Sequence, residues 1–174
     1  MSENKKSVIL VLANNKGGVG KTALTQLFIS YAVCVLKLNV LAIDADRQGN
    51  LSRRTVKDER LEIPSKYFPP VHPDYDEEKY PNWDGVSSLA SLYIKGQPIA
   101  AYPSYEHKNL KVIPAHSSAL EKIEANDVHL NLSYDELLDV PAKFFNPEKM
   151  GKAGFDIVII DTAPALSPTT LGFI

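Results

Sequence analysis

The chain has 174 residues, 44% of them hydrophobic and 23% charged, which suits one globular domain with a substantial core. A formal net charge of −2 gives no overall basic character of the kind that advertises nucleic-acid binding. No apolar run reaches the roughly 18 residues of a membrane-spanning helix, and the polar residues 1–6 do not form a signal peptide, so we expect a cytoplasmic protein. The single cysteine, Cys34, excludes an internal disulfide and a cysteine-based metal cage, and its apolar neighbours predict a buried, inert thiol.

The first elements are predicted to be a strand, a helix and a second strand. Residues 7–13 are apolar and read as a buried strand, and residues 40–43 read as a second one. Between them, residues 21–38 carry apolar side chains at spacings of three and four, which predicts a helix with a broad apolar face. Asn39 is expected to end this helix in the left-handed conformation. The succession predicts a right-handed βαβ unit with a parallel sheet.

A glycine-rich loop, Asn15-Lys16-Gly17-Gly18-Val19-Gly20-Lys21-Thr22, joins the first strand to the helix. Glycines allow successive backbone N–H groups to point at one anion, and the start of the following helix attracts negative charge. Lys21 adds a positive charge for phosphates, and the hydroxyl of Thr22 can bind Mg²⁺. The strict phosphate-loop pattern has glycine where Asn15 stands, but asparagine tolerates the left-handed conformation. Lys16 is an additional lysine that an ordinary phosphate loop does not need.

Two carboxylates follow the second strand, at Asp44 and Asp46. Ligands of parallel α/β sheets collect at the carboxyl ends of the strands. The glycine loop and both carboxylates are expected at that edge, which makes the pair of motifs more specific than either alone.

Residues 55–108 differ in character from the rest of the chain. Prolines and tyrosines punctuate them, together with an acidic run at residues 74–78. They predict a long, partly irregular excursion within the domain, with a short helix over residues 86–93. Either an elaborated connection or a surface that contacts a partner fits this composition.

Order is predicted to return after the excursion. Residues 110–113 read as a strand, and capping boxes at Ser118 and Ser133 are each expected to open a helix, the second of which Pro141 kinks or ends. Residues 155–161 form an apolar, β-branched strand without polar alternation, as in a central parallel strand. It ends on Asp161, a carboxylate that can hold Mg²⁺ beside a phosphate loop.

The three motifs, residues 15–22, residues 44–50 and residues 156–164, resemble those of the ParA/MinD superfamily of deviant Walker A ATPases. Because Asp-x-Asp-x-Gln-Gly-Asn follows the second strand, the chain most resembles the ParA-type partition ATPases. The resemblance spans nearly all 174 residues and is weakest over residues 55–108. It implies an α/β, P-loop NTPase-like fold: a parallel sheet with helices on both faces, in a single domain over residues 1–174.

The resemblance also implies roles for residues that match the family pattern. Lys16 is similar to the signature lysine that reaches the partner's phosphates across a dimer. Asp46 matches the residue thought to orient the attacking water, so the implied catalytic residues are Lys16, Lys21 and Asp46. The implied metal site comprises Thr22, Asp44 and Asp161. The implied nucleotide-binding residues are Asn15, Lys16, Gly17, Gly18, Val19, Gly20, Lys21, Thr22 and Ala23. Ala23 and Arg47 replace a common threonine and a common proline.

The implied function is that of an ATPase with ATP or ADP and Mg²⁺, whose ATP-dependent homodimer acts in plasmid or chromosome segregation. Implied partners are a centromere-binding protein and non-specific DNA, with no membrane, and the full protein would associate with the nucleoid. Family members are usually longer, so we expect a chain shortened at its carboxyl end, with an unpaired apolar strand edge that favours association. A MinD-like ATPase that cycles on membranes, an amide-forming ligase and a nucleotide-binding fragment without activity remain alternatives.

Overall fold

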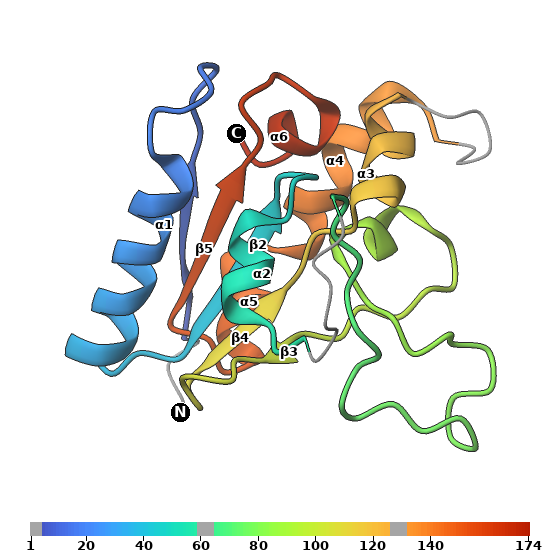
Figure 1. Cartoon of the computed structure of the whole chain (residues 1–174), viewed down its shortest axis with the longest axis horizontal. Helices are drawn as coiled ribbons and strands as arrows, with labels where there is room; N and C mark the ends of the chain where they lie inside the picture. Colours follow the sequence, from blue (N-terminus) through green and yellow to red (C-terminus); the bar gives the residue numbers. More distant parts are fainter. Residues whose placement is uncertain (1–4, 59–64, 126–131) are drawn as a thin grey trace.

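The computed structural model describes residues 5–58, 65–125 and 132–174. Its centre is a five-stranded sheet in the order β1-β5-β2-β4-β3 (Figure 1). The strands are β1 (Val8–Leu12), β2 (Val40–Ala45), β3 (Tyr102–Pro103), β4 (Leu110–Ile113) and β5 (Ile157–Thr162). All neighbouring strands are parallel except the two-residue β3, which pairs antiparallel with β4. The predicted parallel α/β sheet is confirmed, with this antiparallel edge as an addition.

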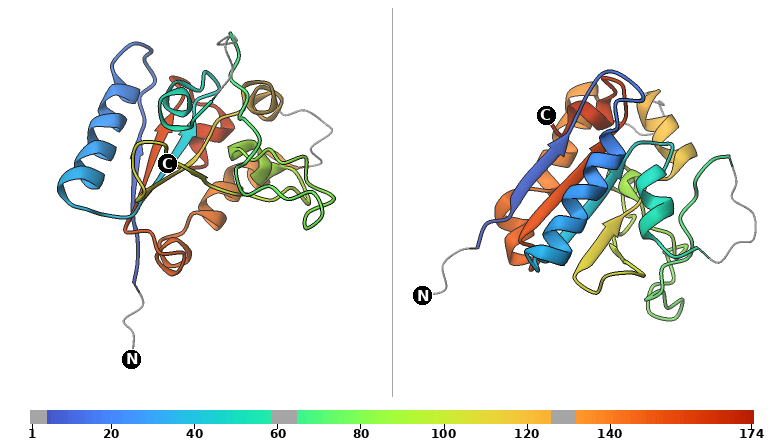
Figure 2. Two further views of the ribbon diagram at one scale, coloured as in Figure 1. Left: turned by 60° about the horizontal axis from the view of Figure 1, so that its bottom comes forward. Right: turned by 60° about the vertical axis from the view of Figure 1, so that its left-hand side comes forward.

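Helices cover both faces of the sheet, as predicted (Figure 2). The helices are α1 (Lys21–Ser30), η1 (Tyr31–Val35), α2 (Asn50–Thr55), η2 (Leu89–Tyr93), α3 (Ser117–Glu124), α4 (Tyr134–Phe144), α5 (Pro147–Lys152) and α6 (Pro168–Leu171). Successive residues of a strand point to opposite faces, and β2 divides accordingly. Leu41 and Ile43 pack in the core beneath α3, α4 and α5, whereas Val40 and Ala42 pack beneath α1, η1 and α2.

The strand β5 lies between β1 and β2, so the predicted βαβ unit spans a central strand that comes much later in the chain. Val158, Ile159 and Ile160 have no exposed surface, because both faces of β5 are covered. This burial accounts for the uninterrupted apolar run that identified the strand.

The long helix predicted over residues 21–38 ends earlier and differently. α1 stops at Ser30, and a π-helical turn, η1, carries the chain on to Val35. The left-handed residue that ends it is Lys37, with φ 56°, so the assignment of this role to Asn39 is wrong. Asn39 instead donates its backbone N–H to Asp156 Oδ2 at 2.7 Å, which fixes the start of β2 beside β5.

The apolar face expected on this helix is mostly exposed. Only Thr25 and Ile29 of α1 and Ala32 and Val33 of η1 are buried. Cys34 is also exposed, contrary to the prediction, and its Sγ lies 3.8 Å from His107 Nε2. Figure 1 shows α1 at one side of the molecule. The helix covers the sheet with a narrow stripe, and it contacts the sheet mainly at the central strand β5. Its exposed apolar residues are Leu24, Leu27, Phe28, Tyr31, Val35 and Leu36.

The two predicted capping boxes have different outcomes. Ser133 caps α4 with Glu136 in a reciprocal box, as predicted. Ser118 lies inside α3, and the cap is His116, whose Nδ1 accepts the N–H of Ala119 at 3.3 Å. Pro141 lies within α4, which continues to Phe144.

The excursion is irregular where the structure describes it, apart from η2 and β3, and residues 59–64 lie outside the described part. The short helix predicted over residues 86–93 is present as the 3₁₀ turn η2. The segment is more than a surface connection, because it buries Tyr67, Trp83 and Tyr102.

The edge predicted to be unpaired is β1. Within the described residues this strand pairs only with β5, and Val8 at its start is 61% exposed. An apolar parallel strand therefore has one free edge within the described residues, as predicted.

Candidate functional site

The carboxyl ends of three strands meet at one place. In the sheet register, Asp161 is opposite Leu12 of β1 on one side and Asp44 of β2 on the other. The glycine loop follows β1 directly, and Asp46 follows β2 directly. The structure therefore brings together the three motifs that the sequence places far apart.

The glycine loop has the backbone geometry of an anion cradle. Gly18 and Gly20 have φ of 71° and 84°, and no atom lies within 4 Å of a Cβ added at either. Glycine is thus favoured at these two positions because the backbone is left-handed, and not because a side chain would clash with a neighbour. Asn15 does not adopt the left-handed conformation, so tolerance of that conformation does not explain why asparagine can replace the first glycine of the phosphate-loop pattern. Gly20 caps α1 without a side-chain hydrogen bond, which leaves the first N–H groups of the helix available to a ligand.

A cleft of about 390 Å³ lies in front of the loop. It is lined by residues 17–23, Asp46, Gln48, Asn50 and Pro164. Asn15 and Lys16 do not line it. Lys16 is exposed, its N–H is held by Asn14 Oδ1 at 2.9 Å, and its carbonyl lies 3.5 Å from Lys21 Nζ.

Asp161 has the environment of a metal ligand. Its side chain is fully buried, and Oδ1 accepts the hydroxyl of Thr25 at 3.0 Å. Oδ2 has no hydrogen-bond partner among the described residues. Burial raises the pKa of Asp161 and Asp46 adds to the rise, while the hydroxyls of Thr22 and Thr25 and the charge of Lys21 oppose it. An orphaned buried oxygen beside Thr22 fits Mg²⁺.

No group of three or more His, Cys, Asp or Glu side chains in the described part of the chain could hold a metal by itself.

Asp44 is fully buried and does not line the cleft. Its Oδ2 accepts the N–H and the hydroxyl of Ser52 at 2.8 and 2.7 Å, and its Oδ1 accepts the N–H of Asp46 at 3.2 Å. Burial raises the pKa of Asp44 to about 7, against the opposing hydrogen bonds of Ser52. These contacts hold the start of α2 and the turn of Asp46, so they support a positioning role, and metal binding by Asp44 stays a prediction.

Asp46 opens a tight turn at the side of the cleft. Its Oδ1 accepts the N–H of Gln48 at 2.9 Å, and its carbonyl accepts the N–H of Gly49. Gly49 has φ 67°, and a Cβ there would lie 2.5 Å from Cβ of Tyr67. The glycine of the Gln-Gly-Asn motif is therefore needed both for the turn and for the approach of the excursion.

The residue patterns did not predict the supporting contacts of Thr25, Ser52 and Arg47, although Arg47 departs from the family pattern. Thr25 is polar within an apolar helical pattern, which is a signal, but the pattern does not show that it meets Asp161. Ser52 and Arg47 carry no signal, because their partners, Asp44 and the carboxylates of α3, depend on the folded chain.

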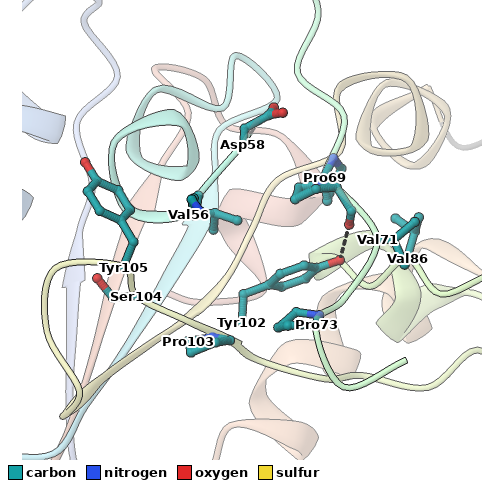
Figure 3. Close-up of a pocket in the computed structure, with 12 residues that line it drawn as sticks. Val56, Asp58, Pro69, Val71, Pro73, Val86, Tyr102, Pro103, Ser104 and Tyr105 are labelled. Carbon is teal, nitrogen blue, oxygen red and sulfur yellow. Dashed lines mark hydrogen bonds between the residues drawn. The ribbon is translucent and has the colours of Figure 1, made fainter. Parts of the chain in front are cut away.

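A larger hollow of about 890 Å³ lies apart from these motifs, within the excursion, and β3 forms part of its lining (Figure 3). Its lining is mainly proline, valine and tyrosine, and Tyr102 donates its hydroxyl to the carbonyl of Pro70 at 2.8 Å. No predicted site residue lines it. Among the described helices, none is long and apolar enough to cross a membrane.

Comparisons with known proteins point in the same direction as the motifs. The AAA_31 family, described as an AAA domain, matches residues 7–172. Protein IncC of Escherichia coli is 32% identical over 165 residues, which are 94% of this chain and 37% of IncC. The chain thus spans little more than a third of that relative.

Solved structures have the same fold. A plasmid partition protein of Borrelia burgdorferi is 19% identical with a TM-score of 0.63, and the match covers 97% of this chain and 61% of that one. Cobyrinic acid a,c-diamide synthase of Mycobacterium smegmatis, solved with ADP and magnesium, is 26% identical with a TM-score of 0.59. That match covers 96% of this chain and 55% of the synthase.

Proposed function

Because the chain belongs to the AAA_31 family and is a ParA/MinD-type ATPase in its motifs and fold, we propose that it binds Mg²⁺ and ATP as part of a ParA-type partition ATPase. The observation that carries the proposal is the buried Oδ2 of Asp161, which has no hydrogen-bond partner among the described residues and lies on a side chain that Thr22 also approaches. A cation that arrives with the phosphates would give this oxygen a partner.

Lys21, Thr22, Asp44, Asp46 and Asp161 each have a proposed task at this site. The N–H groups of residues 17–23 and the ammonium of Lys21 would hold the phosphates, and Thr22 and Asp161 would hold Mg²⁺, which would supply positive charge for the transferred phosphoryl group. Asp46 would orient the attacking water through the oxygen that Gln48 does not occupy. Asp44, which accepts the N–H of Asp46 and the hydroxyl of Ser52, would keep Asp46 in place and is the third proposed metal ligand.

Lys16 is proposed to act in a second subunit. It is exposed outside the cleft, which is consistent with a side chain that reaches phosphates across a dimer rather than its own. Bound ATP would then favour the dimer, and hydrolysis of ATP would shift the population back to separate subunits.

The trans role of Lys16 is tested in the full-length protein. Lys16→Ala should keep nucleotide binding by the monomer and abolish ATP-dependent dimerisation in sedimentation experiments. The matched control is Lys95→Ala, an exposed lysine outside the cleft. Unchanged dimerisation of Lys16→Ala would refute this part of the proposal.

Nucleotide preference is tested by competition. A fluorescent ATP analogue bound to the chain should be displaced by ATP and ADP more readily than by GTP. Lys21→Ala should weaken its binding at least about tenfold, since it removes a charge-assisted contact to phosphate. Equal binding by Lys21→Ala would place the nucleotide elsewhere.

The finer assignments rest on the relatives. IncC and the Borrelia plasmid partition protein favour segregation of plasmid or chromosomal DNA, with a centromere-binding partner and non-specific DNA as ligands and a cytoplasmic, nucleoid-associated location. Because this chain spans 37% of IncC and 61% of the Borrelia protein, those activities are proposed for the whole protein.

Two other functions share the same cleft. A MinD-like ATPase would bring the complete protein to liposomes in a flotation assay, and a partition ATPase would not. The likeness to cobyrinic acid a,c-diamide synthase favours an ATP-dependent, amide-forming reaction. Full activity without Lys16 would support that reaction over the dimer switch.

A further inference from the structure

Two loops meet at the front of the phosphate cleft. One is the turn after β2, which contributes Asp46 and Gln48, and the other follows β5 and contributes Pro164. The second loop leads directly into Ser167, the N-cap of α6. The two loops therefore border the same cleft.

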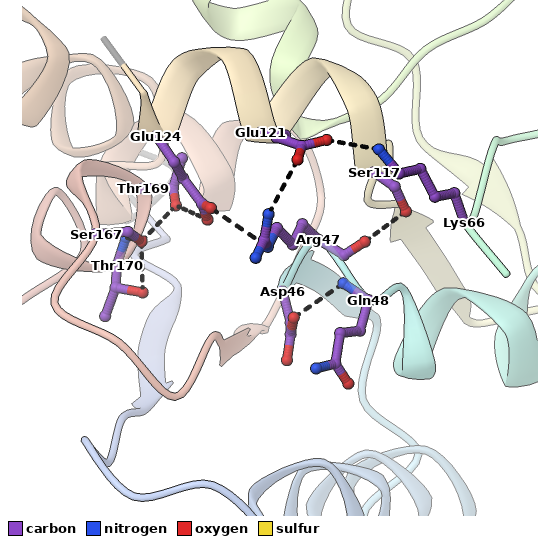
Figure 4. A network of polar contacts seen from close by, with 10 residues as sticks. All are labelled: Asp46, Arg47, Gln48, Lys66, Ser117, Glu121, Glu124, Ser167, Thr169 and Thr170. Atoms are coloured by element: carbon purple, nitrogen blue, oxygen red, sulfur yellow. Dashed lines mark hydrogen bonds and ion pairs between the residues drawn. The ribbon is translucent and has the colours of Figure 1, made fainter.

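Arg47 points away from the cleft, toward α3 (Figure 4). Its guanidinium lies 3.5 Å from Glu121 Oε1 and 3.6 Å from Glu124 Oε2. The carbonyl of Arg47 accepts the hydroxyl of Ser117 at 2.5 Å. Both the backbone and the side chain of the residue after Asp46 are therefore held by α3.

The two carboxylates differ in what else they bind. Glu121 is shared with Lys66, whose Nζ lies 2.7 Å from Oε2. Glu124 is the more buried of the two, with its side chain 18% exposed, and Arg47 is its only ion-pair partner in the described residues. Burial raises the pKa of Glu124 and the charge of Arg47 lowers it, so this charge interaction is the main support of a poorly solvated carboxylate.

Glu124 continues the connection to α6. Its Oε1 accepts the hydroxyl of Thr169 at 3.4 Å, and Thr169 is fully buried. Thr169 Oγ1 lies 2.9 Å from Ser167 Oγ, which also accepts the N–H of Thr170 as the helix cap. A continuous polar path thus runs from the turn of Asp46 through Arg47 and Glu124 to the start of α6.

We propose that Arg47 and Glu124 are positioning residues that couple the turn of Asp46 to the loop between β5 and α6, so that a shift of one loop displaces the other. The proposal rests on the proposed function for what moves the loops, a bound nucleotide, and on the structure alone for the connection. Neither residue touches the cleft, and each acts through the loop that it holds.

Hydrogen exchange of the 174-residue chain tests the connection without nucleotide. Arg47→Ala and Glu124→Gln should each speed exchange in peptides covering residues 165–172 by about threefold to fivefold, the change that loss of one partly exposed ion pair allows. The double variant should match the single ones, because one path is broken once. Amides of β2 and β5 should stay unchanged, which separates a local effect from global destabilisation.

The matched control is Arg54→Ala on α2, whose guanidinium is held by Gln26 at 3.0 Å outside the network. It should leave residues 165–172 as in the parent chain. Unchanged exchange there in Arg47→Ala and Glu124→Gln would overturn the proposal, as would an equal change in Arg54→Ala.

A second arm adds Mg²⁺ and a non-hydrolysable ATP analogue. In the parent chain both residues 44–50 and residues 165–172, which lie beyond the cleft-lining Pro164, should become protected, whereas in Arg47→Ala only residues 44–50 should. Protection of both segments in Arg47→Ala would overturn the coupling. If no segment of the parent chain responds, the proposed function fails, and the nucleotide-free arm still decides the connection.

Discussion

Thr25 holds the carboxylate of Asp161 from the second turn of α1. Its hydroxyl lies 3.0 Å from Asp161 Oδ1 and 3.0 Å from the carbonyl of Lys21, in a fully buried position. The hydroxyl has one proton, and the carboxylate is the stronger acceptor. Oδ2 has no hydrogen-bond partner among the described residues, so it is the oxygen proposed to bind Mg²⁺.

Thr25→Val tests that contact. The valine fills the same volume but leaves Oδ1 unpaired, so the free energy of unfolding should fall by about 1–3 kcal/mol in urea titrations. Thr25→Ser keeps the donor and should recover most of the loss. A change below about 0.5 kcal/mol for Thr25→Val would mean that the contact contributes little.

Gly49→Ala should destabilise the chain by about 2 kcal/mol or more, because a left-handed residue gains a side chain that meets Tyr67. Gly96→Ala is the matched control: its φ is also positive, at 84°, but no atom lies within 4 Å of the added Cβ. It should cost only the conformational part, about 1 kcal/mol. Equal losses in thermal unfolding would show that the contact with Tyr67 is unimportant.

Asp44 gives a pH dependence with a definite sign. Its pKa is raised from 3.8 to about 7 in the folded chain, so the folded state binds a proton that the unfolded state has lost between these values. Stability from this group therefore falls as the pH rises from about 4 to 7. Asp44→Asn has no carboxyl group to titrate at this position. The unfolding free energy of the parent chain should therefore fall relative to that of the variant as the pH rises over that range. A parent chain that gains stability relative to the variant over this range would contradict the raised pKa of Asp44.

At the scale of elements, α1 has one buried stripe and one exposed face. Ile29 is 4% exposed, whereas Leu27, two residues earlier, is 65% exposed. Ile29→Ala should cost about 2–4 kcal/mol of unfolding free energy, and Leu27→Ala less than about 0.5 kcal/mol. Similar costs in denaturant titrations would show that the outer face is covered in solution.

The elements show what a pattern can predict. The strands β4 and β5, the capping box at Ser133 and the convergence of the glycine loop with Asp44, Asp46 and Asp161 all followed from local residue patterns and the direction of parallel strands. The burial of α1 could not be predicted in this way. Apolar residues at spacings of three and four identify one face of a helix, but they do not show which segment, if any, packs against that face. The place of β5 between β1 and β2, and the path through Arg47 to Glu124, depend on contacts between distant segments.

For the whole molecule, two features of the described residues favour association: the exposed apolar side chains of α1 and the free edge of β1. Exposed apolar surface and an unpaired strand edge each provide a site where a second copy can bind. We expect the 174-residue chain to self-associate as its concentration rises, and the double variant Leu27→Lys, Val35→Lys to do so less. Sedimentation velocity without nucleotide decides this, and equal behaviour of both proteins would place any association elsewhere.

The central claim is that Asp161 and the glycine loop bind a nucleotide together with Mg²⁺. Calorimetric titration of the chain with ADP, in the presence and absence of Mg²⁺, tests it most directly. We predict binding that Mg²⁺ strengthens in the parent chain and a loss of the Mg²⁺ effect in Asp161→Asn. No detectable heat from the parent chain, confirmed by the absence of competition with a fluorescent analogue, would contradict the claim and indicate a fragment without activity.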